Sequence, residues 1–320
     1  MFKSLMTFFV GLSAVAAMAG TITVSSPTNG TFLGRTNTFR FTITGSFAQA
    51  RVVVRVISET DPNRSFTFQQ DFNPNVDRQI EGSIPINFSE TTPEGLYRME
   101  VRVTEPNNTY NQPNITGLTI DVVQPRFRDT TPISGAFVRG DVPIIVNLEE
   151  RNLELWRVQV NSQDIPNNTG ATSNINVLWS TGSIQTDGAQ TISIRVEDKA
   201  NNVSNRSINV TVDRRAPSTT VLSPTSTRFR PGATIPVLIN FVDQFQNSIL
   251  FQNVDVLVKD MSDRTLSRVA RLGTNQNGST LQWTGRIRSR GLPRQFKLVV
   301  SAVDRAGNPA ATQTVIVNLR

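Results

Sequence analysis

Two acidic turns contain the residue types that bind cations. They run from Asp198 to Asn202, with the sequence Asp-Lys-Ala-Asn-Asn, and from Asp304 to Asn308, with the sequence Asp-Arg-Ala-Gly-Asn. Carboxylate and amide oxygens suit calcium, but a calcium ion takes about 6 to 8 oxygens, more than one turn supplies. The segments that join the repeats described below also lack grouped Asp and Asn. The sequence therefore predicts no metal site and no cofactor. It predicts hairpin loops in which the aspartates cap backbone amides, with Asn201 or Gly307 at a positive φ.

Arginines in the last third of the chain are suited to binding anions. The formal net charge is −2 over residues 20–124, −2 over 125–213 and +10 over 214–320, which with Lys3 gives +7 for the chain. The guanidinium group binds carboxylates and phosphates through two parallel hydrogen bonds, and arginines that alternate along a strand project from one face. A merely solvated basic face is the alternative, because net charge alone indicates only solubility and non-specific attraction. Six arginines are candidate anion-binding or partner-binding residues: Arg228, Arg230, Arg286, Arg288, Arg290 and Arg294.

The composition excludes several kinds of enzymatic chemistry. The 320 residues include no Cys and no His. Without His there is no Ser-His-Asp triad, no imidazole base and no histidine-ligated metal. Without Cys there is no disulfide, no thiol nucleophile and no thiolate zinc site. No pair of carboxylates is accompanied by a base or an oxyanion motif, so we predict that the protein is not an enzyme.

The first 19 residues have the pattern of a signal peptide. Lys3 supplies a positive charge, residues 5–17 are almost all apolar, and Ala17 and Ala19 are the small residues of a cleavage site. The apolar run is shorter than the roughly 20 residues that span a bilayer, although a short membrane anchor is the alternative. We expect cleavage after Ala19 and export of a mature chain without a transmembrane segment.

The rest of the chain contains three related segments that recur roughly every 100 residues. Alternating apolar and polar residues follow each opening, most regularly from Trp156 to Val160 and from Val254 to Val258. A period of two marks strands with one buried face, and no segment has a sustained 3.6-residue period, so we expect few helices. Each segment opens with a proline that is followed five residues later by a phenylalanine: Pro27 and Phe32, Pro132 and Phe137, and Pro224 and Phe229.

The closing halves of the second and third segments also correspond. A strand-like run ends at Trp179 in one and at Trp283 in the other, and an acidic turn follows each. We expect these tryptophans and Trp156 to fill the core rather than to stack on sugars, because large aromatic side chains in strands are usually buried. Three phenylalanines of the first segment fit either a core or an exposed adhesive strip: Phe66, Phe68 and Phe72.

Together these features resemble tandem bacterial immunoglobulin-like domains. The resemblance rests on the D-x-A-G-N turn between the last two strands and on the proline-initiated strand followed by Phe and Gly. It covers residues 20–320 and is weakest in the first segment, where Glu105-Pro-Asn-Asn-Thr replaces the acidic turn. It implies an all-β fold of three tandem immunoglobulin-like antiparallel β-sandwiches. We place domain 1 at 20–124, domain 2 at 125–213 and the basic domain 3 at 214–320, with short junctions that favour a rod.

Such domain arrays are common in exported surface proteins that are not enzymes. The resemblance therefore implies a structural or adhesion protein of the bacterial cell envelope, in the periplasm, at the cell surface or secreted. The first two domains would act as spacers or partner-binding modules. The basic third domain would dock on an anionic envelope polysaccharide, on lipid phosphate or on an acidic surface-layer protein. The alternative is an extracellular nucleic-acid-binding protein that uses the same arginines.

Overall fold

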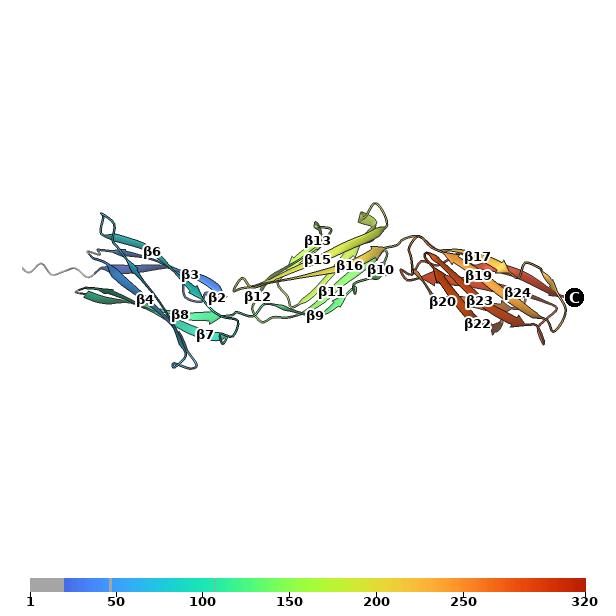
Figure 1. Ribbon diagram of the computed structural model, residues 1–320, viewed down its shortest axis with the longest axis horizontal. Coiled ribbons are helices and arrows are strands. Elements are labelled where there is room, and N and C mark those ends of the chain that lie inside the picture. Colours follow the sequence, from blue (N-terminus) through green and yellow to red (C-terminus); the bar gives the residue numbers. More distant parts are fainter. Residues whose placement is uncertain (1–19, 46–47, 107) are drawn as a thin grey trace, which may run out of the picture. The chain divides into compact units, whose positions relative to one another are not determined.

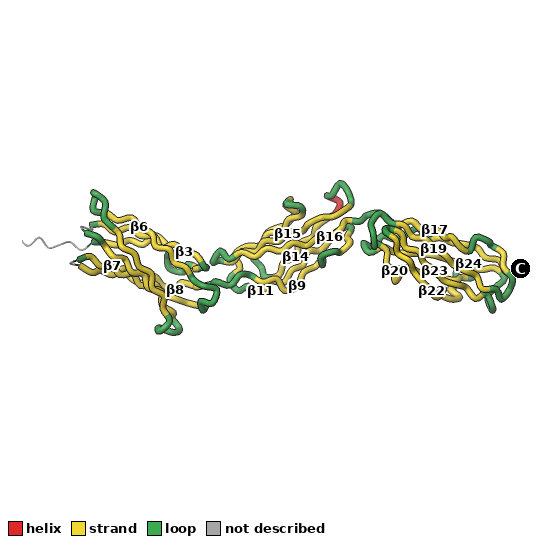
Figure 2. The backbone as a smooth tube through the Cα atoms, in the orientation of Figure 1, coloured by secondary structure: helices red, strands yellow, loops and turns green. Residues whose placement is uncertain are grey.

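A computed structural model describes residues 20–45, 48–106 and 108–320 (Figure 1 and Figure 2). The predicted signal peptide, residues 1–19, lies outside these ranges, so its cleavage stays a prediction. The described residues form strands, loops and one short 3₁₀ helix, Thr181–Ser183. Among them, no helix has the length and apolar character needed to cross a membrane. The strands make six sheets, two in each of three sandwiches.

The first sandwich packs a three-stranded sheet against a five-stranded sheet. The smaller sheet has the order β1-β3-β6 and comprises β1 (Thr21–Ser26), β3 (Thr36–Thr44) and β6 (Gln79–Asn87). The larger sheet has the order β2-β8-β7-β4-β5. Its strands are β2 (Phe32–Leu33), β8 (Asn108–Ile120), β7 (Gly95–Glu105), β4 (Ala50–Ser58) and β5 (Ser65–Phe72).

The second sandwich repeats this arrangement. Its smaller sheet has the order β14-β11-β9 and comprises β14 (Asn174–Ser180), β11 (Asp141–Glu149) and β9 (Arg126–Thr131). Its larger sheet has the order β10-β16-β15-β12-β13. The strands are β10 (Ala136–Val138), β16 (Val203–Val212), β15 (Gly188–Asp198), β12 (Leu153–Val160) and β13 (Gln163–Gly170).

The third sandwich has one strand more in its smaller sheet. That sheet has the order β17-β19-β23-β22 and comprises β17 (Ser218–Ser223), β19 (Thr234–Val242), β23 (Thr280–Arg288) and β22 (Ala270–Asn277). The larger sheet has the order β18-β25-β24-β20-β21. Its strands are β18 (Arg228–Phe229), β25 (Gln313–Leu319), β24 (Gln295–Asp304), β20 (Ile249–Lys259) and β21 (Thr265–Arg268).

Apart from the additional strand β22, the three sandwiches share one topology. The short strand after the opening proline joins the larger sheet and pairs in parallel with the last strand: β2 with β8, β10 with β16, and β18 with β25. The strands of the three smaller sheets are all antiparallel, and the opening prolines Pro27, Pro132 and Pro224 follow cis peptide bonds. Two packed sheets with this division of strands form an immunoglobulin-like sandwich. The predicted all-β fold of three tandem sandwiches is therefore confirmed.

Each sandwich has its own hydrophobic core. The first core is drawn from residues 22–122, the second from 138–212 and the third from 235–319. The predicted alternation appears as burial, since Val177 and Trp179 of β14 are buried whereas Leu178 between them is 57% exposed. Trp156 and Trp283 are buried as well, which confirms the core placement of all three tryptophans.

The three phenylalanines of β5 belong to the first core. Phe66, Phe68 and Phe72 are partly buried and pack against it. Phe66 and Phe68 lie edge-on to the ring of Phe88 at centroid distances of 5.4 and 6.1 Å, and Phe72 lies edge-on to Phe41 at 5.0 Å. Edge-to-face pairs at these distances are favourable contacts of buried aromatic side chains. Of the two interpretations open at the sequence level, the core placement is correct, and the exposed adhesive strip is wrong.

Contacts between residues divide the chain into two units, which are described separately below. One unit ends at Gln124 and also includes the loop Asp198–Asn202. The other consists of Pro125–Glu197 and Val203–Arg320 and contains the second and third cores. The domain border at 213/214 stays a prediction.

Residues 214–320 expressed alone should fold into a β-rich unit with a single cooperative thermal transition. All the strands and core residues of the third sandwich lie within this segment, so its hydrophobic burial does not depend on the rest of the chain. Circular dichroism during heating measures the transition. A gradual, non-cooperative loss of signal would contradict the border at 213/214.

Candidate functional site

The candidate arginines lie at exposed positions of the third sandwich. Arg286 and Arg288 are on β23, with the buried Ile287 between them. Because successive side chains of a strand point to opposite faces, both guanidinium groups project from the solvent side of the sheet. Arg290 is also exposed and lies just beyond the end of β23. The pattern of alternating arginines thus corresponds to one exposed face over Arg286 and Arg288, with Arg290 in the following turn.

Backbone hydrogen bonds bring the other candidate arginines to the same end of the sandwich. The carbonyl of Arg230 accepts a hydrogen bond from Ala233 N, and the carbonyl of Ala233 accepts one from Ser289 N. The carbonyl of Arg294 accepts one from Leu319 N. These bonds join the loop after β18, the loop after β23 and the last strand, β25. The candidate arginines of two separate segments, 228–230 and 286–294, therefore meet at the end of the sandwich where β25 ends.

Candidate arginines line two of the open grooves on this sandwich. One, of about 520 Å³, is lined by Arg286 and Arg288 of β23 together with Arg268 of β21. The other, of about 670 Å³, is lined by Arg294 and Arg320. Guanidinium groups at the rim of a groove can grip a carboxylate or phosphate through paired hydrogen bonds. Arg268 and Arg320 were not predicted, because neither alternates with another arginine in the sequence.

Among the described residues, the six candidate arginines form no salt bridge. The nearby acids are engaged with other cations, and the candidate arginines therefore keep their charge available for an external anion. Whether they bind one stays a prediction. The engaged pairs are Asp255 with Arg268, Asp260 with Arg264 at 3.0 Å, and Asp263 with Lys297 at 2.8 Å.

The two acidic turns are the loops that the sequence predicts. Asp304 Oδ1 accepts a hydrogen bond from the backbone N–H of Asn308 at 2.7 Å. Asp198 Oδ1 likewise accepts one from the backbone N–H of Asn202 at 2.8 Å. The capping role of both aspartates is confirmed. The predicted positive φ angles are also present, at Asn201 (62°) and Gly307 (89°).

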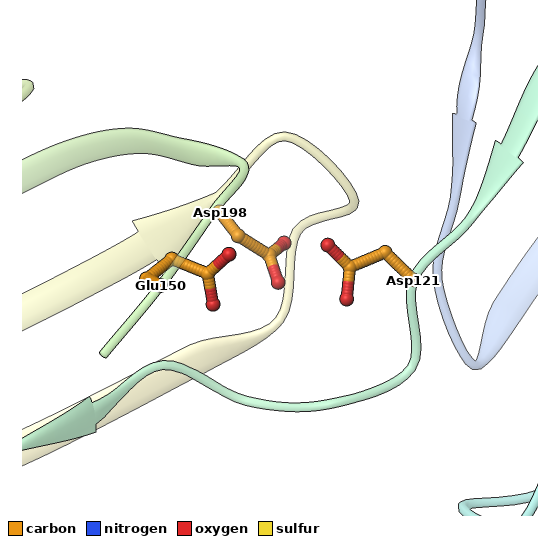
Figure 3. Close-up of side chains that lie close together, drawn as sticks. All are labelled: Asp121, Glu150 and Asp198. Carbon is orange, nitrogen blue, oxygen red and sulfur yellow. The ribbon is translucent and has the colours of Figure 1, made fainter. Parts of the chain in front are cut away.

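In the unit that contains the first sandwich, the first acidic turn binds the residue that follows β8. Asn202 Nδ2 donates to the carbonyl of Asp121 and to Asp198 Oδ2, both at 2.8 Å. Figure 3 shows the carboxyl groups of Asp121 and Asp198 facing one another, and an oxygen of each lies within 4.8 Å of the other. Burial raises the pKa of Asp198; hydrogen bonds from Asn202 oppose this shift, and the charge of Asp121 adds to it.

In the other unit, the second acidic turn belongs to a cluster of three buried carboxylates. The residues are Asp213, Asp243 and Asp304, which are 0, 7 and 2% exposed, and one oxygen of each lies within 4.8 Å of the others. Asn308 Nδ2 donates to the carbonyl of Asp213 at 2.9 Å and to Asp304 Oδ2 at 2.7 Å. Burial raises the pKa of Asp213, with a smaller opposing effect from the hydrogen bond of Gln244 and a further rise from the charges of Asp243 and Asp304.

Cations near this carboxylate cluster are engaged with other groups. Arg214 Nε donates to Asp187 Oδ1 at 2.6 Å. Burial by itself would raise the pKa of Asp187, but hydrogen bonds from Gln244 and Arg214 outweigh it and lower the pKa. The guanidinium of Arg305 lies over a phenylalanine ring at 4.8 Å, and Arg139 Nε donates to a backbone carbonyl of the acidic turn at 3.1 Å. The three carboxylates are thus close together, and these arginines do not neutralise them.

The sequence-based interpretation that the junctions lack grouped acids is wrong, because the structure contains these two groups of carboxylates. That interpretation considered acids that are neighbours in the sequence, whereas the fold brings together acids that are far apart. A usable signal was present: Asp121 precedes Pro125 by four residues, and Asp213 precedes Pro217 by the same interval, each directly after the last strand of its repeat. In the third repeat, Arg320 follows the last strand instead.

Comparisons with known proteins assign no family to the chain. No protein-family model matches the chain, and neither does any curated protein. A tandem-domain fragment of titin aligns with a TM-score of 0.37 and 12% identity over 94% of this chain and 99% of that one. The fibronectin(III)-like modules of Clostridium thermocellum CbhA align with a TM-score of 0.34 and 14% identity over 60% of this chain and 94% of that one. Domains of chicken CNTN1 align with a TM-score of 0.33 and 9% identity over 93% of this chain and 98% of that one. By its strand topology, the chain is a tandem immunoglobulin-like β-sandwich protein.

Proposed function

We propose that this protein is a non-enzymatic, exported structural or adhesion protein of the bacterial cell envelope. In this proposal the arginine-rich end of the third sandwich docks on an anionic envelope polysaccharide. The observation that carries the proposal is the meeting of six exposed arginines from two chain segments, none of which forms a salt bridge within the described residues. Such a surface attracts polyanions over distances of about a Debye length and releases their counterions on binding.

The distribution of charge supports docking through one domain only. Residues 214–320 carry a net charge of +10, whereas residues 20–124 and 125–213 carry −2 each. The first two sandwiches are therefore repelled by a polyanion, and the third is attracted. An arrangement of this kind leaves the first two sandwiches free to act as spacers or to bind other partners.

A non-enzymatic role agrees with the residue types available. The chain has neither His nor Cys, the usual general base and the usual thiol nucleophile of hydrolytic sites. The described side chains that line these two grooves are cationic, amide, hydroxyl or apolar. Their chemistry suits binding of an anion rather than acid–base catalysis.

Replacing Arg286, Arg288 and Arg290 together by Ser should weaken the binding of residues 20–320 to polyanions and flatten its salt dependence. Each arginine that contacts the polymer contributes about one unit to the slope of log affinity against log salt. The fold should persist, because all three side chains are exposed. Fluorescence titration with polygalacturonate, polyphosphate and duplex DNA over a salt series, together with co-sedimentation with purified envelope, measures the effect.

A matched control removes the same charge from the first sandwich. Arg40, Arg55 and Arg102 are exposed, and their joint replacement by Ser should leave polyanion affinity nearly unchanged. Equal losses in both triple variants would show that only net charge matters and would contradict a docking surface on the third sandwich. Strong preference for DNA over the carboxylated polymer would favour the nucleic-acid alternative, and envelope binding that protease treatment of the envelope abolishes would favour an acidic surface-layer protein.

A further inference from the structure

One buried oxygen in the carboxylate cluster of the second unit accepts no hydrogen bond from any residue that the structure describes. Asp213 Oδ1 accepts a hydrogen bond from Gln244 Nε2 at 2.6 Å. Asp213 Oδ2 is buried and has no hydrogen-bond partner among the described residues, although Asp213 is completely buried. A buried, unpartnered carboxylate oxygen beside two further carboxylates is strongly unfavourable unless a cation or a proton compensates it. The cluster therefore requires a compensating charge that the neighbouring arginines do not supply.

We propose that Asp213, Asp243 and Asp304 bind a divalent cation, and that calcium is the ion that fits best. The ligands are all hard oxygens, and the chain has no Cys or His that would favour zinc or copper. Oxygens bound to one calcium ion lie about 2.3 to 2.6 Å from it and hence at most about 5 Å apart. The three carboxylate oxygens are within 4.8 Å of one another and meet this limit.

Calcium fits this environment better than magnesium does. Magnesium dehydrates reluctantly and usually keeps several waters, whereas calcium accepts irregular cages of carboxylates. The three aspartates are nearly completely buried, so an ion here loses most of its hydration shell. Each carboxylate oxygen that already accepts one hydrogen bond, such as Asp243 Oδ2 from Ser248 Oγ at 2.6 Å, still has a lone pair for the ion.

The three ligands come from the two sandwiches of the second unit. Asp213 directly follows β16, the last strand of the second sandwich, and its N–H donates to the carbonyl of Val138 at 3.0 Å. Asp243 follows β19, and Asp304 is the last residue of β24, both in the third sandwich. The third sandwich begins with β17 at Ser218, so only four residues separate it from Asp213. An ion at the cluster would tie the start of this connection to the third sandwich and restrict its motion.

The same local arrangement occurs a second time, in the first unit. Asp121 directly follows β8, and its N–H donates to the carbonyl of Leu33 at 3.0 Å. Its own carbonyl accepts from Asn202, as the carbonyl of Asp213 accepts from Asn308. Its carboxylate lies beside Asp198, as that of Asp213 lies beside Asp304. Two turns of related sequence thus place an aspartate pair in the same way.

Calcium should stabilise residues 20–320, and Asp213→Asn should remove the part of this effect that arises at the cluster. Calcium modules of extracellular proteins bind with dissociation constants of about 0.1 to 1 mM, so about 10 mM calcium should raise the melting midpoint of the third sandwich by roughly 6 to 11 °C. Differential scanning calorimetry with calcium, with magnesium and with a chelator measures the shift. The variant should gain at most a small fraction of it.

A comparison of Asp213→Asn with the parent in the presence of a chelator distinguishes ion binding at Asp213 from a merely structural role. Without calcium, Asp213→Asn should melt at or above the midpoint of the parent, because it removes one of three adjacent buried charges. A structural hydrogen bond lost in the variant would instead lower the midpoint equally with and without calcium, and that result would overturn the proposal. Asp263→Asn, an exposed substitution with the same change of charge, should keep the full calcium shift.

Two other results would also overturn the proposal. If calcium leaves the midpoint of the parent unchanged, Asp213 is compensated by a proton and not by an ion. If Asp213→Asn keeps the full calcium shift, the ion binds elsewhere. Asp243→Asn serves as the second variant in case Asp213→Asn does not fold, and isothermal titration of the folded parent with calcium should then show one more site than titration of Asp243→Asn.

Discussion

Trp179→Ala should destabilise the second sandwich by about 3 to 5 kcal/mol. Trp179 is 1% exposed, is the largest fully buried side chain among the described residues and belongs to the second core. Its removal takes a bicyclic ring out of a close-packed interior, and the loss combines the transfer free energy of the ring with the energy of the cavity that it leaves. Urea unfolding followed by fluorescence measures the change. With Trp283→Phe in the parent and the variant, the emission of Trp156 reports on the second sandwich.

The neighbouring residue provides the control for this prediction. Leu178 is on the same strand, β14, but points to solvent and is 57% exposed. Leu178→Ala should change the free energy of unfolding by no more than about 0.5 kcal/mol. Trp179→Phe should cost less than half as much as Trp179→Ala, because it keeps an aromatic ring and removes an indole N–H that has no hydrogen-bond partner in the described parts of the chain. Similar losses for Leu178→Ala and Trp179→Ala would contradict the assigned faces of β14.

Asn308→Ala should destabilise the third sandwich by about 3 kcal/mol. The Asn308 side chain is 3% exposed and donates two hydrogen bonds, to the carbonyl of Asp213 and to Asp304 Oδ2. Alanine leaves both acceptors buried without this donor, and one of them is a carboxylate oxygen, for which the penalty is larger than for a neutral group. Scanning calorimetry in the presence of a chelator should show a fall of about 10 °C in the midpoint of the third sandwich.

An exposed asparagine of the same sandwich is the matched control. Asn275 on β22 is exposed, and Asn275→Ala should leave the midpoint almost unchanged. If Asn308→Ala were as stable as this control, the hydrogen bonds from Asn308 to the two aspartates would contribute nothing to stability. Water entering the turn would then have to satisfy both acceptors.

Local patterns in the sequence predicted the fold correctly. The alternation around Trp156 and Trp179, and the recurrence of proline with phenylalanine at Phe32, Phe137 and Phe229, placed strands and repeats where the structure has them. The alternation of Arg286 and Arg288 around Ile287 also placed both arginines on the solvent face. These features follow from the pleat of a strand, which assigns every second residue to one face whatever the strand packs against.

The ambiguous residues were those whose environment depends on distant segments. Phe66, Phe68 and Phe72 alternate like core residues and like an exposed strip, and only the positions of Phe41 and Phe88, on or beside strands of the opposite sheet, decide between the two. Whether an arginine forms a salt bridge also depends on distant segments. The acids nearest to the candidate arginines are engaged with other cations, which no local pattern reveals.

The sequence by itself thus determined the fold class, the repeats and the faces of the strands, because these depend on a period of two residues within short segments. Only the tertiary structure decided how the acids are grouped. Asp213, Asp243 and Asp304 are separated by tens of residues and meet because three strand ends converge, two in one sandwich and one in its neighbour within the same unit. Their burial beside one another, and the unpartnered oxygen of Asp213, arise from that convergence.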